Sequence, residues 1–256
     1  YVRLPHADTS LYPRPDGVDE EALVMLSDIL PTGFECGVLN GKVKPGDTMA
    51  IVGAGPIGLA ALLTAQLYTP SEIFMIDSGA NRLEIAERFG ATTTLNSAEG
   101  FVAERLLNAT GGRGVDVAIE AVGKPETFAL CTQLVAAGGV VANIGVHGAP
   151  ATLHLENLWD RNITITTRLV DTVSTPMLLK TLKSGRIDAH TLTTHRFSLD
   201  NILEAYYQRL TNPDPAVHLP AAAAFTRFEN GCTFMDVPPD EIRNDPPEKA
   251  LHFALV

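Results

Sequence analysis

Positive charge, cysteine and long apolar runs are all scarce in this chain of 256 residues. Lys and Arg number 19 against 30 Asp and Glu, and the net charge of -11 argues against a nucleic acid partner, whose phosphates require clustered positive charge. The three cysteines, Cys36, Cys131 and Cys232, form no C-x-x-C pair and indicate a reducing, cytoplasmic compartment rather than a disulfide framework. No apolar run reaches the ~18 residues of a membrane span, so we expect no membrane partner.

What the chain does contain is a glycine-rich motif behind a short apolar, β-prone run at residues 48–52. The six residues that follow fit G-x-G-x-x-G, and they are Gly53, Ala54, Gly55, Pro56, Ile57 and Gly58. In such a motif the first glycine makes a tight turn, the second admits a pyrophosphate, and the third lets helix and strand pack closely. The helix that opens at this motif would present unpaired N–H groups to the phosphates. Alone, the pattern also fits a purely structural turn.

A second strand, predicted at residues 73–76, ends in Asp77, nineteen residues past Gly58. An acid at about this distance is the expected partner of an adenosine ribose hydroxyl. The glycine motif and Asp77 together predict a dinucleotide-binding site.

Beyond Asp77, short apolar runs alternate with helical runs, which predicts an α/β fold: a doubly wound, parallel Rossmann sheet of six strands with helices on both faces. The strands are expected at 48–52, 73–76, 115–119, 140–144 and 162–169, and a turn followed by a strand is expected at 90–95. Besides the helix at the glycine motif, helices are expected at 20–30, 32–39, 81–89, 98–109, 125–135, 176–184 and 200–210.

Two acids near the start of the chain stand at helix boundaries. Asp28 interrupts the apolar face of the helix expected at 20–30, and its carboxylate needs a partner because an unpaired buried charge is costly. Spacing alone favours a helix-end or capping acid at this position. Thr32 and Glu35 match a capping box, which predicts that the next helix begins at Thr32.

Several separated motifs make the sequence resemble the zinc-containing medium-chain alcohol dehydrogenases, in particular their secondary-alcohol branch, over about residues 1–210. Besides the glycine motif, the segments that carry the resemblance are Leu26-Ser-Asp28-Ile-Leu-Pro-Thr32-Gly-Phe, Lys44-Pro-Gly-Asp, Gly112-Arg-Gly-Val-Asp116, Gly138-Gly139 and Thr194-His195-Arg-Phe. The resemblance implies the C-terminal portion of such an enzyme. The implied parts are a catalytic-domain remnant with an entry helix (1–31), an NAD-binding Rossmann domain (32–172), returning helices (173–210) and an irregular, divergent tail (211–256).

The resemblance also implies roles for individual residues. Asp28 would be the third protein ligand of a catalytic zinc, and His195 would be structural. The residues implied to contact NAD are Thr32 and Gly33 beside the nicotinamide, Val122, Ile144, Gly145 and Val146 at the same end, Ala54 to Ile57 at the pyrophosphate, Asp77 and Arg82 at the ribose, and Phe89 on the adenine side. Asp77 favours NAD, because a carboxylate repels the 2′-phosphate of NADP.

The chemistry implied is hydride transfer between a small alcohol and its aldehyde or ketone, with zinc as the Lewis acid. The family's Cys and His-Glu metal ligands, its proton relay and its four-cysteine structural lobe have no counterpart in this sequence. We therefore expect an oxidoreductase portion that is incomplete by itself. The alternative is a non-catalytic NAD(H)-binding and dimerisation module, while zinc-free reductases of the same superfamily are disfavoured by Asp28.

The run at 162–169 is predicted to be the final strand of the sheet, and its free edge is the expected assembly surface. It alternates Ile163 and Ile165 with Thr164 and Thr166 and contains no proline, so little hinders pairing with a second chain. In the family resembled, this edge joins its copy across a two-fold axis, which implies a homodimer or a homotetramer. The alternative is an edge covered by the proline-rich tail.

Overall fold

The computed structural model describes residues 7–193. The predicted helix at 200–210, the tail at 211–256, His195 and Cys232 lie outside the described residues. Within residues 7–193, none of the helices combines the length and the hydrophobicity needed to cross a membrane.

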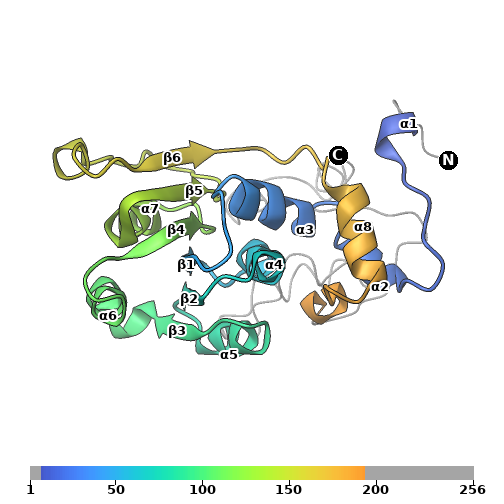
Figure 1. Cartoon of the computed structure of the whole chain (residues 1–256), viewed down its shortest axis with the longest axis horizontal. Helices are drawn as coiled ribbons and strands as arrows, with labels where there is room; N and C mark the ends of the chain where they lie inside the picture. The colour runs from blue at the N-terminus through green and yellow to red at the C-terminus, as the bar shows by residue number, and fades with distance from the viewer. Residues whose placement is uncertain (1–6, 194–256) are drawn as a thin grey trace, which may run out of the picture.

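Six strands form a sheet of order β3-β2-β1-β4-β5-β6, and all neighbouring strands are parallel (Figure 1). The strands are β1 (Thr48–Val52), β2 (Glu72–Asp77), β3 (Thr93–Asn96), β4 (Val115–Glu120), β5 (Val135–Asn143) and β6 (Thr164–Thr167). The strand order reverses between β1 and β4, the switch point at which doubly wound sheets bind their ligands. The predicted fold class is confirmed.

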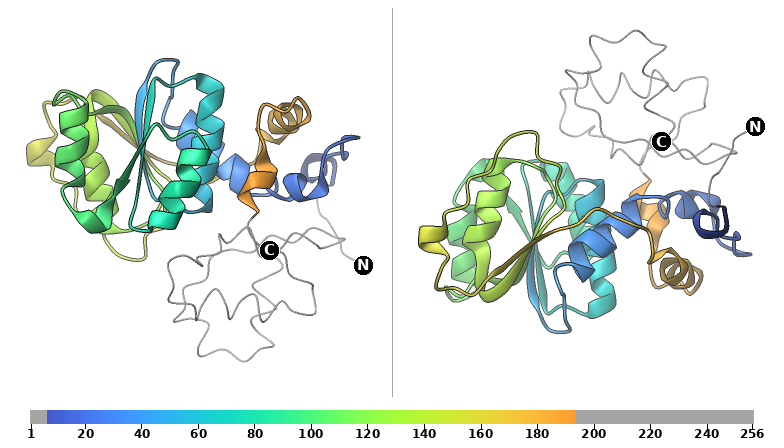
Figure 2. Two further views of the ribbon diagram at one scale, coloured as in Figure 1. Left: turned by 90° about the horizontal axis from the view of Figure 1, so that it is seen from below. Right: turned by 90° about the horizontal axis from the view of Figure 1, so that it is seen from above.

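Helices lie on both faces of this sheet (Figures 1 and 2). The described α-helices are α1 (Ala7–Ser10), α2 (Glu20–Val24), α3 (Ile29–Pro31), α4 (Pro56–Ala65), α5 (Ala80–Arg88), α6 (Val102–Ala109), α7 (Pro125–Leu134) and α8 (Thr175–Lys183). A π-helix, η1 (Thr32–Leu39), continues α3, and short 3-10 helices are η2 (Gln66–Tyr68), η3 (Ser97–Glu99), η4 (Leu155–Asn157) and η5 (Ala189–Leu192).

Alternate residues of the central strands pack into two apolar cores, one on each face of the sheet. Met49, Ile51 and Met75 belong to the core that also contains side chains of η1, α4 and α5. Val52 and Phe74 belong to the core beneath α6 and α7. Because both faces of β1 and β2 are buried, their sequences are continuous apolar runs rather than alternating ones.

Two predicted helices are each divided in the structure. The run at 20–30 ends as α2 at Val24 and resumes as α3, because Asp28 between them has φ -154 and ψ -57, which is not helical. The run at 98–109 is split by Phe101, whose left-handed φ of +56 separates η3 from α6.

Two predicted strands also have different limits. β5 begins at Val135 rather than at 140, because Val135 already pairs with Val115 before the register shifts. Gly138, with φ +79, therefore lies inside a bulged strand and not in a turn before it. β6 is shorter than the predicted 162–169. It cannot begin at Asn162, whose left-handed φ of +52 is incompatible with an extended strand.

The predicted capping box is wrong. Pro31 is already helical, with φ -58 and ψ -41, and Thr32 continues the helix by donating its N–H to the carbonyl O of Asp28 (2.8 Å). The buried carboxylate of Glu35 instead accepts hydrogen bonds from the backbone N (2.8 Å) and Oγ (2.6 Å) of Ser174, 139 residues away. Glu35 therefore fixes the start of α8 rather than the start of its own helix.

Candidate coenzyme-binding site

The glycine motif forms an open cradle at the carboxyl end of β1. Gly53 turns the chain with φ +106, a conformation that residues with a Cβ rarely adopt. A Cβ at Gly58 would lie 1.8 Å from the carbonyl O of Gly53, so helix and strand can pack this closely only with glycine there. By contrast, a Cβ at Gly55 would have no atom within 4 Å. α4 begins at Pro56 without a side-chain cap, which leaves its first N–H groups to a ligand or solvent.

Asp77 ties this cradle to the end of β2. Its side chain is 7% exposed, and its two oxygens accept hydrogen bonds from Ala54 N and from Gly79 N, each at 2.8 Å. The guanidinium of Arg82, in the first turn of α5, lies 3.5 Å from Asp77 Oδ2. The structure therefore brings both residues predicted for the ribose to the glycine loop.

Phe89 is a predicted site residue that the structure does not bring to this edge. It follows the last residue of α5 and packs against the core that contains α4. α5 runs from the carboxyl end of β2 toward the amino end of β3, and its 9 residues span about 13 Å. Phe89 therefore lies near the amino ends of the strands, whereas Asp77 lies at their carboxyl ends.

The residues predicted for the nicotinamide end gather around the carboxyl ends of β1, β4 and β5. Val122 adjoins the glycine loop, since a Cβ at Gly53 would lie 2.7 Å from its Cγ2. Ile144 packs against η1, where a Cβ at Gly37 would lie 2.9 Å from its Cδ1. Gly33, also in η1, abuts α4, because a Cβ there would lie 2.5 Å from the α4 backbone.

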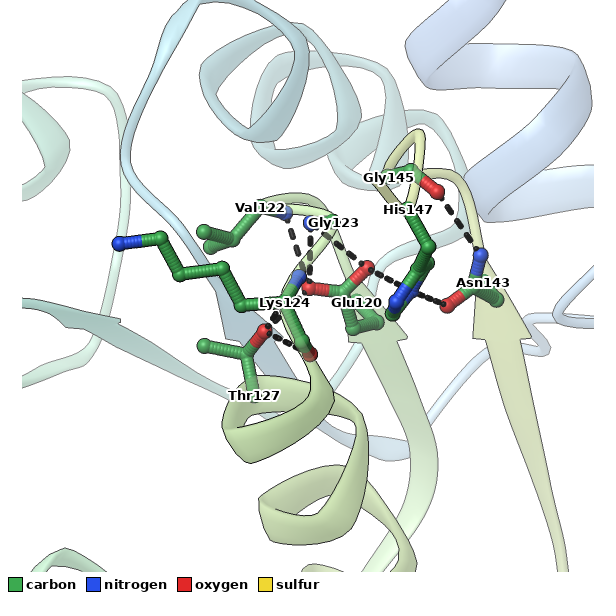
Figure 3. A network of polar contacts seen from close by, with 8 residues as sticks. All are labelled: Glu120, Val122, Gly123, Lys124, Thr127, Asn143, Gly145 and His147. Atoms are coloured by element: carbon green, nitrogen blue, oxygen red, sulfur yellow. Dashed lines mark hydrogen bonds and ion pairs between the residues drawn. The ribbon is translucent and has the colours of Figure 1, made fainter. Parts of the chain in front are cut away.

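Glu120, the last residue of β4, is a residue of this site that we did not predict. Its side chain is fully buried, and Oε1 accepts hydrogen bonds from Val122 N (3.0 Å), Gly123 N (2.9 Å) and Thr127 Oγ1 (2.6 Å) (Figure 3). Its backbone O also accepts from the N–H groups of the first two residues after β5 (2.8 and 3.1 Å). One residue thus holds the loops that follow β4 and β5.

The pattern that led to Asp77 could also have led to Glu120. Each acid ends a buried apolar strand, and a glycine follows two or three residues later, at Gly79 and Gly123 respectively. Glu120 also acts electrostatically on Cys131 in α7. Burial raises the pKa of the Cys131 thiol well above its usual value, and the carboxylate of Glu120 adds to the rise.

Asp28, the predicted zinc ligand, lies between α2 and α3 and makes no side-chain cap to α3. Its Oδ1 accepts a hydrogen bond from Thr32 Oγ1 (2.8 Å), which joins it to a residue predicted to contact the nicotinamide. Among residues 7–193, the side chains close enough together to hold a metal are Asp19, Glu21 and His190, a largely exposed group that excludes Asp28. Because catalytic zinc takes three protein ligands, the described residues do not complete a zinc site at Asp28.

Cys36 does not fill this gap. It is buried in η1, and burial raises the pKa of its thiol to about 11, although Arg168 opposes this rise. Among the described residues, Cys36 also belongs to no group of side chains close enough together to hold a metal. Cys36 is therefore a core residue.

The sequence of this chain matches a known protein family. A family model described as zinc-binding dehydrogenase matches residues 56–183, half of the chain. An alcohol dehydrogenase of Cupriavidus necator is 37% identical over 210 residues, which cover 80% of this chain and 57% of that protein. An NADP-dependent isopropanol dehydrogenase of Thermoanaerobacter brockii is 32% identical over 227 residues, covering 80% of this chain and 60% of that protein.

The fold is also that of a solved relative. The apo form of zinc dependent alcohol dehydrogenase 2 from Streptococcus pneumonia is 52% identical, with a TM-score of 0.78 over 81% of this chain and 59% of that chain. The present chain thus spans less than two thirds of the length of each of these relatives. The family match extends from the start of α4 to the end of α8 and includes Asp77 and Glu120. This chain belongs to the zinc-binding dehydrogenase family.

Proposed function

We propose that this chain is the coenzyme-binding portion of an NAD-dependent alcohol dehydrogenase that transfers hydride between a small alcohol and its aldehyde or ketone. The observation that carries the proposal is the hydrogen bond from Ala54 N to Asp77 Oδ2 (2.8 Å), because it joins the glycine cradle and the acid in one site. Relatives named alcohol dehydrogenase, at 37% and 52% identity, support the reaction class.

The residues present fit a dinucleotide. The open space before Gly55 and the uncapped N-terminus of α4 suit the pyrophosphate, since N–H groups and the helix dipole favour an anion there. Asp77 then binds the adenosine ribose, and the loops after β4 and β5, with Thr32 and Gly33, enclose the nicotinamide. The bound coenzyme supplies the C4 atom that exchanges hydride, and this chain binds and orients it.

We further propose NAD rather than NADP. A buried carboxylate at Asp77 repels a 2′-phosphate, and the nearby Arg82 is paired with that carboxylate at 3.5 Å. Because the Thermoanaerobacter brockii relative is named as NADP-dependent, the choice between NAD and NADP for this chain is tested by titrating it with both coenzymes. Titration with NADH, followed by competition with AMP, tests the site itself. We expect saturable NADH binding that AMP displaces, and a chain that binds neither NADH nor AMP would contradict the proposal.

Asp28 is the zinc ligand that we propose from this chain. The hydroxyl of Thr32 donates to its Oδ1 and would hold the carboxylate in one orientation. A bound zinc would polarise the substrate oxygen. Because the described residues do not complete the site, we assign no step of the reaction to the metal.

The second candidate function is a non-catalytic module that binds NAD(H) and dimerises. The zinc site that the described residues leave incomplete favours it. The two candidates differ in whether the coding sequence continues upstream into Cys and His-Glu ligand motifs, which genomic sequence decides. By itself, we expect this chain to oxidise small alcohols negligibly, with or without added zinc.

For assembly, we propose a homodimer through β6, extended to a homotetramer if a second surface contributes. Among the described residues, β6 pairs only with β5, so its other edge has unpaired backbone groups. Its end residues Thr164 and Thr167 are exposed, and such an edge favours self-pairing across a two-fold axis.

A further inference from the structure

The loop after β5 is folded back onto β4 and α7 through His147. Its Nε2 lies 2.9 Å from Asn143 Oδ1 and 3.5 Å from Glu120 Oε2 (Figure 3). Its ring meets that of Phe128 edge-on, with centroids 6.1 Å apart. Asn143 Nδ2 donates to the carbonyl O of Gly145 (3.0 Å), which turns its Oδ1 toward His147. Because the amide oxygen of Asn143 can only accept, Nε2 of His147 carries the hydrogen.

The loops after β4 and β5 interlock without spare room. A Cβ at Gly145 would lie 2.3 Å from Glu120 Oε2 and 2.1 Å from Gly123 N. A Cβ at Gly123 would lie 2.3 Å from the carbonyl O of Val146. The side chain of Val146 itself is 92% exposed, so it projects from the loop rather than supporting it. A displacement of the Glu120 carboxylate must therefore move both loops together.

The carboxylate of Glu120 has no exposed surface through which it could reach a ligand. Its polar partners are the backbone N–H groups of Val122 and Gly123, the Thr127 hydroxyl and His147. The side chain of Lys124 points away from it (Figure 3). Donors rather than a fixed cation thus compensate the buried charge, and their geometry depends on where the loops lie.

We propose that Glu120, with His147 as its partner, is a positioning residue for the nicotinamide half of the coenzyme. The inference rests on the proposed function, because the loops that it fixes are those predicted to enclose the nicotinamide. The adenosine half is held separately, by Asp77 and the glycine cradle. Disturbing the pair should therefore weaken contacts to the nicotinamide and leave those to ADP-ribose intact.

Two variants disturb the pair in different ways. In Glu120→Gln, the amide oxygen can keep the three hydrogen bonds of Oε1, while the amide NH₂ faces the N–H of His147 and repels it. In His147→Phe, the aromatic contact with Phe128 is kept, and the hydrogen bond to Asn143 is lost. Glu126→Gln, an exposed position on α7, is the matched control for removing a carboxylate.

The experiment is calorimetric titration of the full chain and each variant with NADH and with ADP-ribose. We expect Glu120→Gln and His147→Phe to weaken NADH binding about tenfold, the loss of roughly one charged hydrogen bond. Affinity for ADP-ribose should change less than about twofold in these variants, and Glu126→Gln should change neither affinity.

Equal losses for NADH and ADP-ribose in both variants would overturn the inference, since they would indicate a general structural role. Unchanged NADH affinity in both variants would overturn it as well. If Glu120→Gln fails to fold, His147→Phe decides alone. An unaltered chain that binds neither ligand would overturn the proposed function and the inference with it, whereas the other failures leave the proposed function standing.

Discussion

One added methyl group tests whether the shape of the glycine cradle has the purpose that we assign to it. In Gly58→Ala, the new Cβ would lie 1.8 Å from the carbonyl O of Gly53, and real Cβ atoms essentially never come within 3.0 Å of such a neighbour. The clashing atom belongs to the backbone, so no side chain can rotate away. α4 must therefore separate from the end of β1, and the core between α4 and the sheet must shift.

Overpacking of this kind costs about 1–3 kcal/mol, and a backbone neighbour places Gly58→Ala near 3 kcal/mol. In a chain of this size each kcal/mol lowers Tm by about 2–4 °C, so we expect a fall of roughly 6–12 °C. Gly55→Ala is the matched variant, because its Cβ meets nothing within 4 Å and its φ of -76 suits alanine. It should keep stability within about 0.5 kcal/mol but weaken NADH binding about tenfold or more, since the methyl occupies the place of the pyrophosphate.

Thermal and urea unfolding followed by circular dichroism, together with NADH titration, measure both effects. The reasoning would be refuted by a Gly58→Ala chain as stable as the unaltered one. It would equally be refuted by a Gly55→Ala chain that binds NADH as tightly as before.

Asp77→Ser should narrow the preference for NADH over NADPH, because it removes the charge that repels a 2′-phosphate; an unchanged affinity ratio would contradict this. Burial by itself would raise the pKa of Asp116. Hydrogen bonds from Thr48 N and Arg113 outweigh this effect and hold the pKa below its usual value of 3.8. The stability from a lowered pKa is present at neutral pH and is lost as pH falls, so Asp116→Asn should destabilise at pH 7 and flatten the urea-unfolding profile between about pH 5 and 2. Ile165→Pro should remove a donor from β6 and yield monomer in light scattering, and an unaltered chain that is monomeric well above micromolar concentration would refute the dimer.

The sheet and the cradle were predictable because local sequence specifies them. Gly53 to Gly58 and Asp77 belong to one strand–helix–strand unit, whose spacing fixes where they meet. The buried strands were recognisable as apolar runs because helices cover both of their faces. Strand limits were less certain, since a bulge at Gly138 depends on how β5 pairs with β4.

The roles of the two buried glutamates were not predictable from spacing, because their partners are distant or unremarkable in sequence. Glu35 matched a local capping box, yet its Oε1 accepts hydrogen bonds from the backbone N and the Oγ of Ser174, 139 residues further along the chain. Glu120 bonds to its own loop, but its importance follows from the packing of that loop against Gly145. Phe89 was assigned to the adenine side from the family resemblance alone. The resemblance does not show that the 9 residues of α5 carry Phe89 away from the carboxyl ends of the strands, where Asp77 lies.

The central claim is that this chain binds NAD(H) at the carboxyl edge of its sheet and that Asp77 selects NAD. Calorimetric titration of the purified, unaltered chain with NADH and with NADPH at one ionic strength tests it most directly. We predict saturable NADH binding at one site per chain, clearly tighter than the binding of NADPH. NADPH binding of equal or greater affinity, or no binding of either coenzyme, would contradict the account.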